Sequence, residues 1–140
     1  MRHGETDLNR DNRLQGQIDC PLNDTGIRQA KEAGERFRSM GLTFDRVYGS
    51  TLCRAVDTAA LAAGIPKVEV ICDARLLEID YGPYEAVPFS ELRKEMFDFF
   101  HDPEHVAPPN GVEPISELMK RIGAFCSIFA RKKKPKVSWL

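Results

Sequence analysis

The first residues of the chain place a histidine between an arginine and a glycine, as Arg2-His3-Gly4. A neutral imidazole can attack phosphorus and carry the phosphoryl group covalently. The guanidinium beside it can hold two phosphate oxygens in a bidentate grip, and a glycine lets the backbone come close to a ligand. These three residues predict phosphoryl chemistry if other parts of the chain bring further charge to the same place.

Six short motifs follow at defined intervals, and each alone is weak. As a set, in this order and spacing, they resemble the histidine phosphatase superfamily, also called the phosphoglycerate mutase-like family. The resemblance runs from Arg2 to about Arg121. The motifs are Asn9, Arg13-Leu14-Gln15-Gly16, Asp19-Cys20-Pro21-Leu22, Gly26-Ile27-Arg28-Gln29-Ala30, Ser50-Thr51-Leu52-Cys53-Arg54-Ala55 with Thr58-Ala59, and Leu77-Glu78-Ile79-Asp80-Tyr81-Gly82.

The resemblance implies a role for each matching residue. His3 is expected to be the nucleophile, and Arg2 and Arg54 are expected to clamp the phosphate. Glu78 is expected to protonate the leaving group and then to activate water. Substrate-binding positions are expected at Asn9, Gln15 and Gly16, with Thr6 and Ser50 as secondary candidates.

Taken one at a time, these residues have simpler interpretations. Arg2 can equally be interpreted as a solvated residue at the terminus, and a lone histidine such as His3 is more often structural. An arginine on a small-residue helix, as Arg54 is, is usually exposed, and so is a loop carboxylate such as Glu78. Their joint spacing is what favours a shared site.

Two parts of the family pattern are absent from this sequence. The family places an apolar strand before its Arg-His-Gly, and here only Met1 precedes Arg2. The family also has a second histidine on a later strand, whereas this chain ends at Val137-Ser138-Trp139-Leu140. The resemblance therefore implies a domain truncated at both ends, with weakened activity.

The alternation of strands and helices predicts an α/β sheet with helices on both faces. The resemblance implies that this three-layer, phosphoglycerate mutase-like arrangement is incomplete here. One domain is expected over residues 1–140, with a small helical lid-like insertion at 83–114. Residues 1–25 are expected to be mostly loop. The predicted helices cover 26–40, 52–63, 88–100 and 115–132, and the predicted strands cover 44–48 and 68–72.

Composition argues against several other classes of protein. The net charge of -1 does not indicate nucleic acid or an anionic membrane as partner. No apolar run is long enough to span a bilayer, and no signal peptide is expected, because the first residues are polar. Four scattered cysteines predict reduced thiols in the cytoplasm. His101 and His105 flank Pro103, which argues against a helical metal pair, so neither a metal nor a cofactor is expected. The basic run at 131–134 is interpreted as a solvated helix end.

The sequence thus predicts a phosphomonoesterase acting on a small phosphorylated metabolite through a phosphohistidine. Two alternatives remain open: phosphoryl transfer of the phosphoglycerate mutase type, and a non-catalytic phosphate-binding remnant of the family. The sequence predicts neither the identity of the phosphomonoester nor an oligomeric state.

Overall fold

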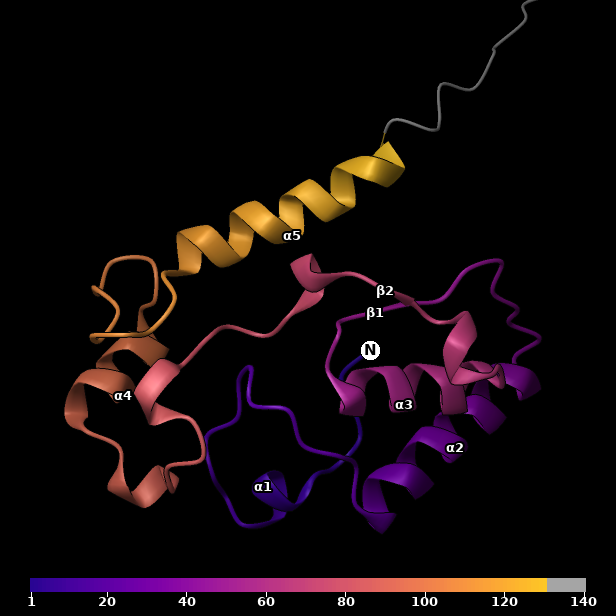
Figure 1. Ribbon diagram of the computed structural model, residues 1–140, viewed down its shortest axis with the longest axis horizontal. Coiled ribbons are helices and arrows are strands. Elements are labelled where there is room, and N and C mark those ends of the chain that lie inside the picture. The colour runs from indigo at the N-terminus through magenta and orange to yellow at the C-terminus, as the bar shows by residue number, and fades with distance from the viewer. Residues whose placement is uncertain (131–140) are drawn as a thin grey trace, which may run out of the picture.

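The computed structural model describes residues 1–130 and has an α/β architecture built around a small parallel sheet (Figure 1). Strands β1 (Tyr48–Gly49) and β2 (Ile71–Cys72) pair in parallel, with Tyr48 opposite Ile71 and Gly49 opposite Cys72. Helices α2 and α3 lie on one side of the sheet, and α5 lies on the other (Figure 1). The helices are α1 (Asp7–Arg10), α2 (Asp24–Ser39), α3 (Cys53–Ala63), α4 (Lys94–His101) and α5 (Ile115–Ala130), with 3₁₀ turns η1 (Lys67–Glu69), η2 (Ala74–Leu76), η3 (Gly82–Tyr84) and η4 (Phe89–Glu91).

Helices α2 and α3 form the pair predicted at 26–40 and 52–63, and local capping explains their ends. The Asn23 side chain caps α2 by accepting a hydrogen bond from the Gly26 amide at 2.9 Å. Gly64 ends α3 in the left-handed conformation, with φ of 70°. The helices pack closely because a Cβ on Gly34 would lie 2.8 Å from the Ala62 carbonyl oxygen.

Both strands are shorter than the sequence pattern predicts. The strand expected at 44–48 is observed only as β1. In the strand expected at 68–72, Val68 lies instead in η1 and is 90% exposed. The strands are short because β1 and β2 pair at two positions, and apolar residues beyond those positions have no strand to pair with in the described structure. In a parallel ladder alternate residues bond to opposite sides, so the Tyr48 amide and carbonyl face away from β2.

Residues 83–114 pack on the N-terminal loop around an apolar cluster. The cluster consists of Leu14, Ile79, Leu92, Met96, Phe99 and Val112. The predicted helix at 88–100 is wrong in its first part: η4 is followed by Leu92 and Arg93 in extended conformation, and α4 begins at Lys94. This break lets Leu92 enter the cluster beside Met96 and Phe99. The lid-like role of this segment stays a prediction.

Met96 is fully buried in this cluster, with 0% exposure. We expect Met96→Ala to lower the free energy of unfolding by about 2–5 kcal/mol, because it removes apolar contacts and leaves a cavity. Urea unfolding followed by circular dichroism measures the change. Met119→Ala is the matched control, since Met119 on α5 is 63% exposed. Equal losses in the two variants would show that the cluster does not stabilise the fold.

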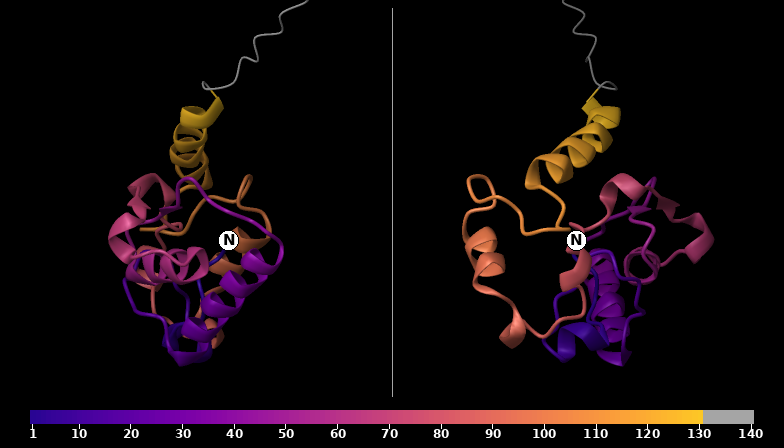
Figure 2. Two further views of the ribbon diagram at one scale, coloured as in Figure 1. Left: turned by 90° about the vertical axis from the view of Figure 1, so that its right-hand side faces the viewer. Right: turned by 60° about the vertical axis from the view of Figure 1, so that its left-hand side comes forward.

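Helix α5 stands apart from α2 and α3 in both turned views (Figure 2). It reaches the sheet through Tyr48, whose ring makes edge contacts with Phe125 and Phe129 at centroid distances of 5.5 and 5.4 Å. The predicted helix at 115–132 is confirmed as far as Ala130, and the basic run that follows lies outside the described residues. All four cysteines are free. Among residues 1–130, no helix is long and apolar enough to cross a bilayer.

Candidate active site

The backbone next to His3 is fixed against both α2 and α3. The Gly4 amide donates to the Thr58 hydroxyl at 3.0 Å, and that hydroxyl donates to the Arg54 carbonyl at 2.7 Å. A Cβ on Gly4 would lie 2.9 Å from the Gly26 Cα and closer still to the Gly26 carbonyl oxygen. Gly4 therefore permits a close backbone approach, as expected of a glycine, and the neighbour it approaches is the start of α2.

A hydrogen bond to the backbone fixes the tautomer of the His3 imidazole. Its Nδ1 lies 2.7 Å from the Gly4 carbonyl oxygen, which can only accept, so Nδ1 carries the hydrogen. In the neutral ring, Nε2 then holds the free lone pair. Burial is the main cause that lowers the pKa of His3 below 6.5, and the charges of Arg54 and Arg2 lower it further. The hydrogen bond to Gly4 and the negative charge of Glu78 raise the pKa, but by less. The imidazole of His3 is thus mostly neutral at neutral pH.

The lowered pKa of His3 predicts a specific dependence on pH. In the folded state the imidazole binds a proton less readily than in the unfolded chain, so its contribution to stability is complete above pH 6.5 and is lost as the pH falls through the lower folded-state pKa. The acid limb of kcat/KM is likewise expected to have its midpoint below pH 6.5. NMR titration of the His3 ring measures the pKa directly. A midpoint at or above 6.5 would contradict the prediction.

Arg54 is buried within α3, with 1% exposure, although the sequence pattern alone favours a surface position. Its Nη1 donates to the Ile18 carbonyl at 2.7 Å, and its Nη2 donates to the Gly16 carbonyl at 2.5 Å. Within residues 1–130 its Nε has no hydrogen-bond partner, and no carboxylate forms an ion pair with it. A buried cation in this state attracts an anion strongly, because little water screens it.

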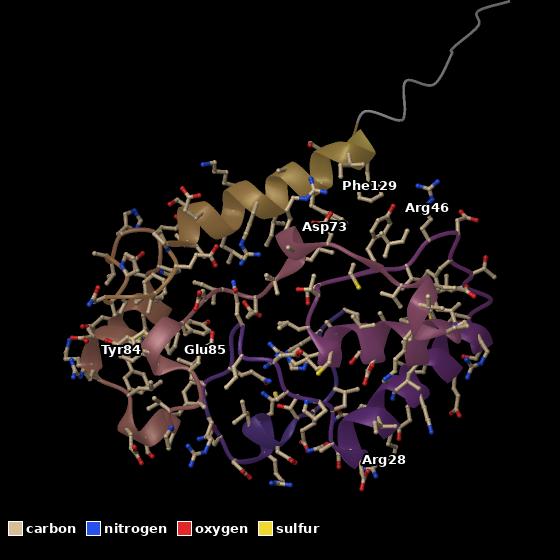
Figure 3. The ribbon with its side chains drawn as sticks, viewed as in Figure 1. Arg28, Arg46, Asp73, Tyr84, Glu85 and Phe129 are labelled. Carbon is tan, nitrogen blue, oxygen red and sulfur yellow. The ribbon has the colours of Figure 1, made fainter. Side chains whose placement is uncertain are left out.

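Arg2, His3, Arg54 and Glu78 line one cavity of about 940 Å³. The four residues come from the N-terminal segment, from α3 and from the segment after η2, and the fold brings them together across up to 76 positions of sequence. Ser50 also lines this cavity, which continues between α3 and α5 as an apolar space. Figure 3 shows Phe129, one of the lining residues, on the α5 side.

Glu78 is exposed, and contacts from two directions hold its backbone. The Gln17 side-chain amide donates to the Glu78 carbonyl at 3.0 Å, and Arg121 Nη2 donates to the same oxygen at 2.9 Å. Arg121 is itself fixed by Glu113, with 2.8 Å between Nε and Oε1. Helix α5 therefore fixes the position of Glu78 even though it contributes no predicted catalytic residue.

Asn9, Gln15 and Gly16 do not line the cavity that holds Arg54. Asn9 forms a capping box with the buried Thr6 at the start of α1, and it lines a second cavity of about 370 Å³ that Arg2 and His3 share. The Gln15 Oε1 accepts a hydrogen bond from the Thr6 hydroxyl at 3.0 Å. Gly16 has no room for a side chain, because a Cβ there would lie 2.7 Å from the Tyr81 ring.

Sequence reasoning placed Thr58 in one of the family motifs but gave it no role in this geometry. Thr58 joins the His3 segment to α3, and the available signal was its position four residues after Arg54 on the same helix face. His101 and His105 bond instead to the Phe97 carbonyl and to Asp102, at 2.7 and 2.8 Å. In the described part of the chain, no three His, Cys, Asp or Glu residues form a cluster able to hold a metal ion.

A family model, the histidine phosphatase superfamily (branch 1), matches residues 1–139. The chain belongs to this superfamily. It is 44% identical over 95 residues to the probable phosphoglycerate mutase GpmB of Proteus mirabilis, covering 68% of this chain and 43% of that protein. It is also 34% identical over 128 residues to a phosphoglycerate mutase of Schizosaccharomyces pombe, covering 86% of this chain and 60% of that protein.

Solved structures of histidine phosphatases share this fold. The alpha-ribazole phosphatase from Shigella flexneri superimposes with a TM-score of 0.78 at 27% identity, covering 94% of this chain and 65% of that one. The YhfR protein of Bacillus stearothermophilus gives a TM-score of 0.77 at 34% identity, covering 94% of this chain and 66% of that one. The chain spans about two fifths to two thirds of the length of these relatives.

Proposed function

We propose that this histidine phosphatase hydrolyses a small phosphomonoester through a phosphohistidine at His3. The observation that carries the proposal is the pairing of a buried Arg54, which has no carboxylate partner in the described chain, with an imidazole whose Nε2 is free, in one cavity. A phosphate dianion satisfies the cation, and the imidazole is the group that can attack it.

The proposed reaction has two steps. In the first, His3 Nε2 bonds to phosphorus, the ester P–O bond breaks, and the protonated Glu78 gives its proton to the departing oxygen. In the second, the Glu78 carboxylate takes a proton from water, the water oxygen bonds to phosphorus, and the P–N bond breaks. Arg2 and Arg54 hold the phosphoryl oxygens in both steps. Asn9, which lines the adjoining cavity with Arg2 and His3, is proposed to contact the substrate, and Gln15 and Gly16 are proposed to support the site through Thr6 and Arg54.

The exposure of Glu78 favours hydrolysis, because water reaches the group that has to activate it. Mutase chemistry is the second candidate, and the two relatives named as phosphoglycerate mutases favour it. A mutase transfers the phosphoryl group of the same phosphohistidine to a second sugar acid and has to exclude water. The cytoplasm is the proposed compartment, since four free cysteines suit a reducing environment.

The test is to incubate the protein with p-nitrophenyl phosphate and with 3-phosphoglycerate, the latter with and without its bisphosphorylated primer. Release of inorganic phosphate without isomerisation supports the phosphatase. Primer-dependent isomerisation without phosphate release would instead establish the mutase. Binding of phosphate without any turnover would establish the non-catalytic alternative.

A further inference from the structure

The Glu85 carboxylate is held by backbone amides of a distant loop. Its Oε1 accepts hydrogen bonds from the Gln17 amide at 2.6 Å and the Tyr81 amide at 3.3 Å, and its Oε2 accepts from the Ile18 amide. Within residues 1–130 no lysine or arginine forms an ion pair with it. In Figure 3, Glu85 lies next to Tyr84 at the end of η3. The negative charge of Glu85 is therefore satisfied by backbone N–H groups, two of them from the loop of residues 16–18.

Arg54 binds the same loop by donating hydrogen bonds to two of the loop's carbonyl groups. The guanidinium donates to the Gly16 and Ile18 carbonyls, whereas the Gln17 and Ile18 amides donate to Glu85. The loop of residues 16–18 thus lies between a buried cation and a carboxylate, and the Gly16–Gln17 peptide group bonds to both, through its carbonyl to Arg54 and through its N–H to Glu85. Gln17 also reaches the Glu78 carbonyl from this loop at 3.0 Å.

We propose that Glu85 is a positioning residue for the phosphate site. By fixing the 16–18 loop, Glu85 holds the two carbonyls that orient the Arg54 guanidinium, and it holds Gln17 where that side chain supports Glu78. Glu85 transfers no proton and does not contact the substrate. This inference rests on the proposed function, because it assigns Arg54 to an anion.

Two variants test the role of Glu85. Glu85→Ala removes both acceptor oxygens, and Glu85→Gln retains the size of the side chain and one of the oxygens. We expect Glu85→Ala to weaken phosphate binding about 10-fold, the effect of about one lost hydrogen bond to a charged group, with Glu85→Gln in between. We expect kcat/KM to fall up to about 10²-fold, because the reacting groups are misplaced. Amide exchange at residues 16–18 is expected to become faster.

The control is Glu91→Ala, an exposed carboxylate in η4. The pH profile separates positioning from proton transfer: in Glu85→Gln the midpoints of both limbs are expected to stay at their wild-type values. Shifted midpoints would overturn the inference. A phosphate Kd within twofold of wild type in Glu85→Ala would also overturn the inference, and so would unchanged amide exchange at residues 16–18. Neither of these results would contradict the proposed function. Failure of the wild-type protein to bind inorganic phosphate would overturn the proposed function and this inference together.

Discussion

Replacing His3 with alanine is expected to lower kcat for p-nitrophenyl phosphate by about 10³-fold or more, since it removes the atom that we propose carries the phosphoryl group. Covalent labelling gives a second measurement. Wild-type protein mixed with substrate and quenched in alkali should gain the mass of one phosphoryl group on the peptide that contains His3. The variant should gain none.

His3→Asn separates chemistry from structure in this experiment. The asparagine amide can still donate to the Gly4 carbonyl, the bond that His3 Nδ1 makes at 2.7 Å, but it offers no nucleophilic nitrogen. It should be as inactive as His3→Ala and more stable. His105→Ala is the matched control, because that exposed histidine bonds only to Asp102 in the described structure. Wild-type turnover in His3→Asn would rule out the phosphohistidine.

Replacing Arg54 with methionine is expected to lower kcat/KM by about 10²–10³-fold, the usual effect of losing one preorganised donor to a developing oxyanion. Arg54→Lys should also lose most activity, because an ammonium does not reproduce the planar fork that reaches two carbonyls and, as we propose, a phosphate. Both variants leave the Gly16 and Ile18 carbonyls without their donor, so the folded state is also expected to lose stability.

Ligand-dependent melting distinguishes the binding role of Arg54 from its structural role. Phosphate that binds only the folded state raises the stability of the wild-type protein by about 2.7 kcal/mol at 100 times Kd. Arg54→Met should show little rise in Tm with phosphate, whatever its starting Tm. Arg28→Met is the control, since Arg28 is exposed on α2 and is seen at its outer side in Figure 3. An equal rise in wild type and Arg54→Met would remove Arg54 from the phosphate site.

The helix pair could be predicted from sequence because its signals are local. Asn23 and Gly64 mark the ends of α2 and α3 through contacts within a few residues, and the small residues that let the helices approach stand at helical spacing. The strands and the start of α4 were predicted poorly. Pairing of β1 with β2 and burial of Leu92 depend on partners elsewhere in the chain, and apolar periodicity does not report those partners.

The sequence alone determined which chemical groups are available and in what order, and their spacing was sufficient to assign the superfamily. Only the tertiary structure decided that Arg54 is buried without a carboxylate, that His3 has a free Nε2, and that both line one cavity with Glu78. The reason is the distance over which each effect acts. Caps and helical periods span a few residues, whereas the bonds that place Arg54 and Glu85 join positions 36 and 68 residues apart.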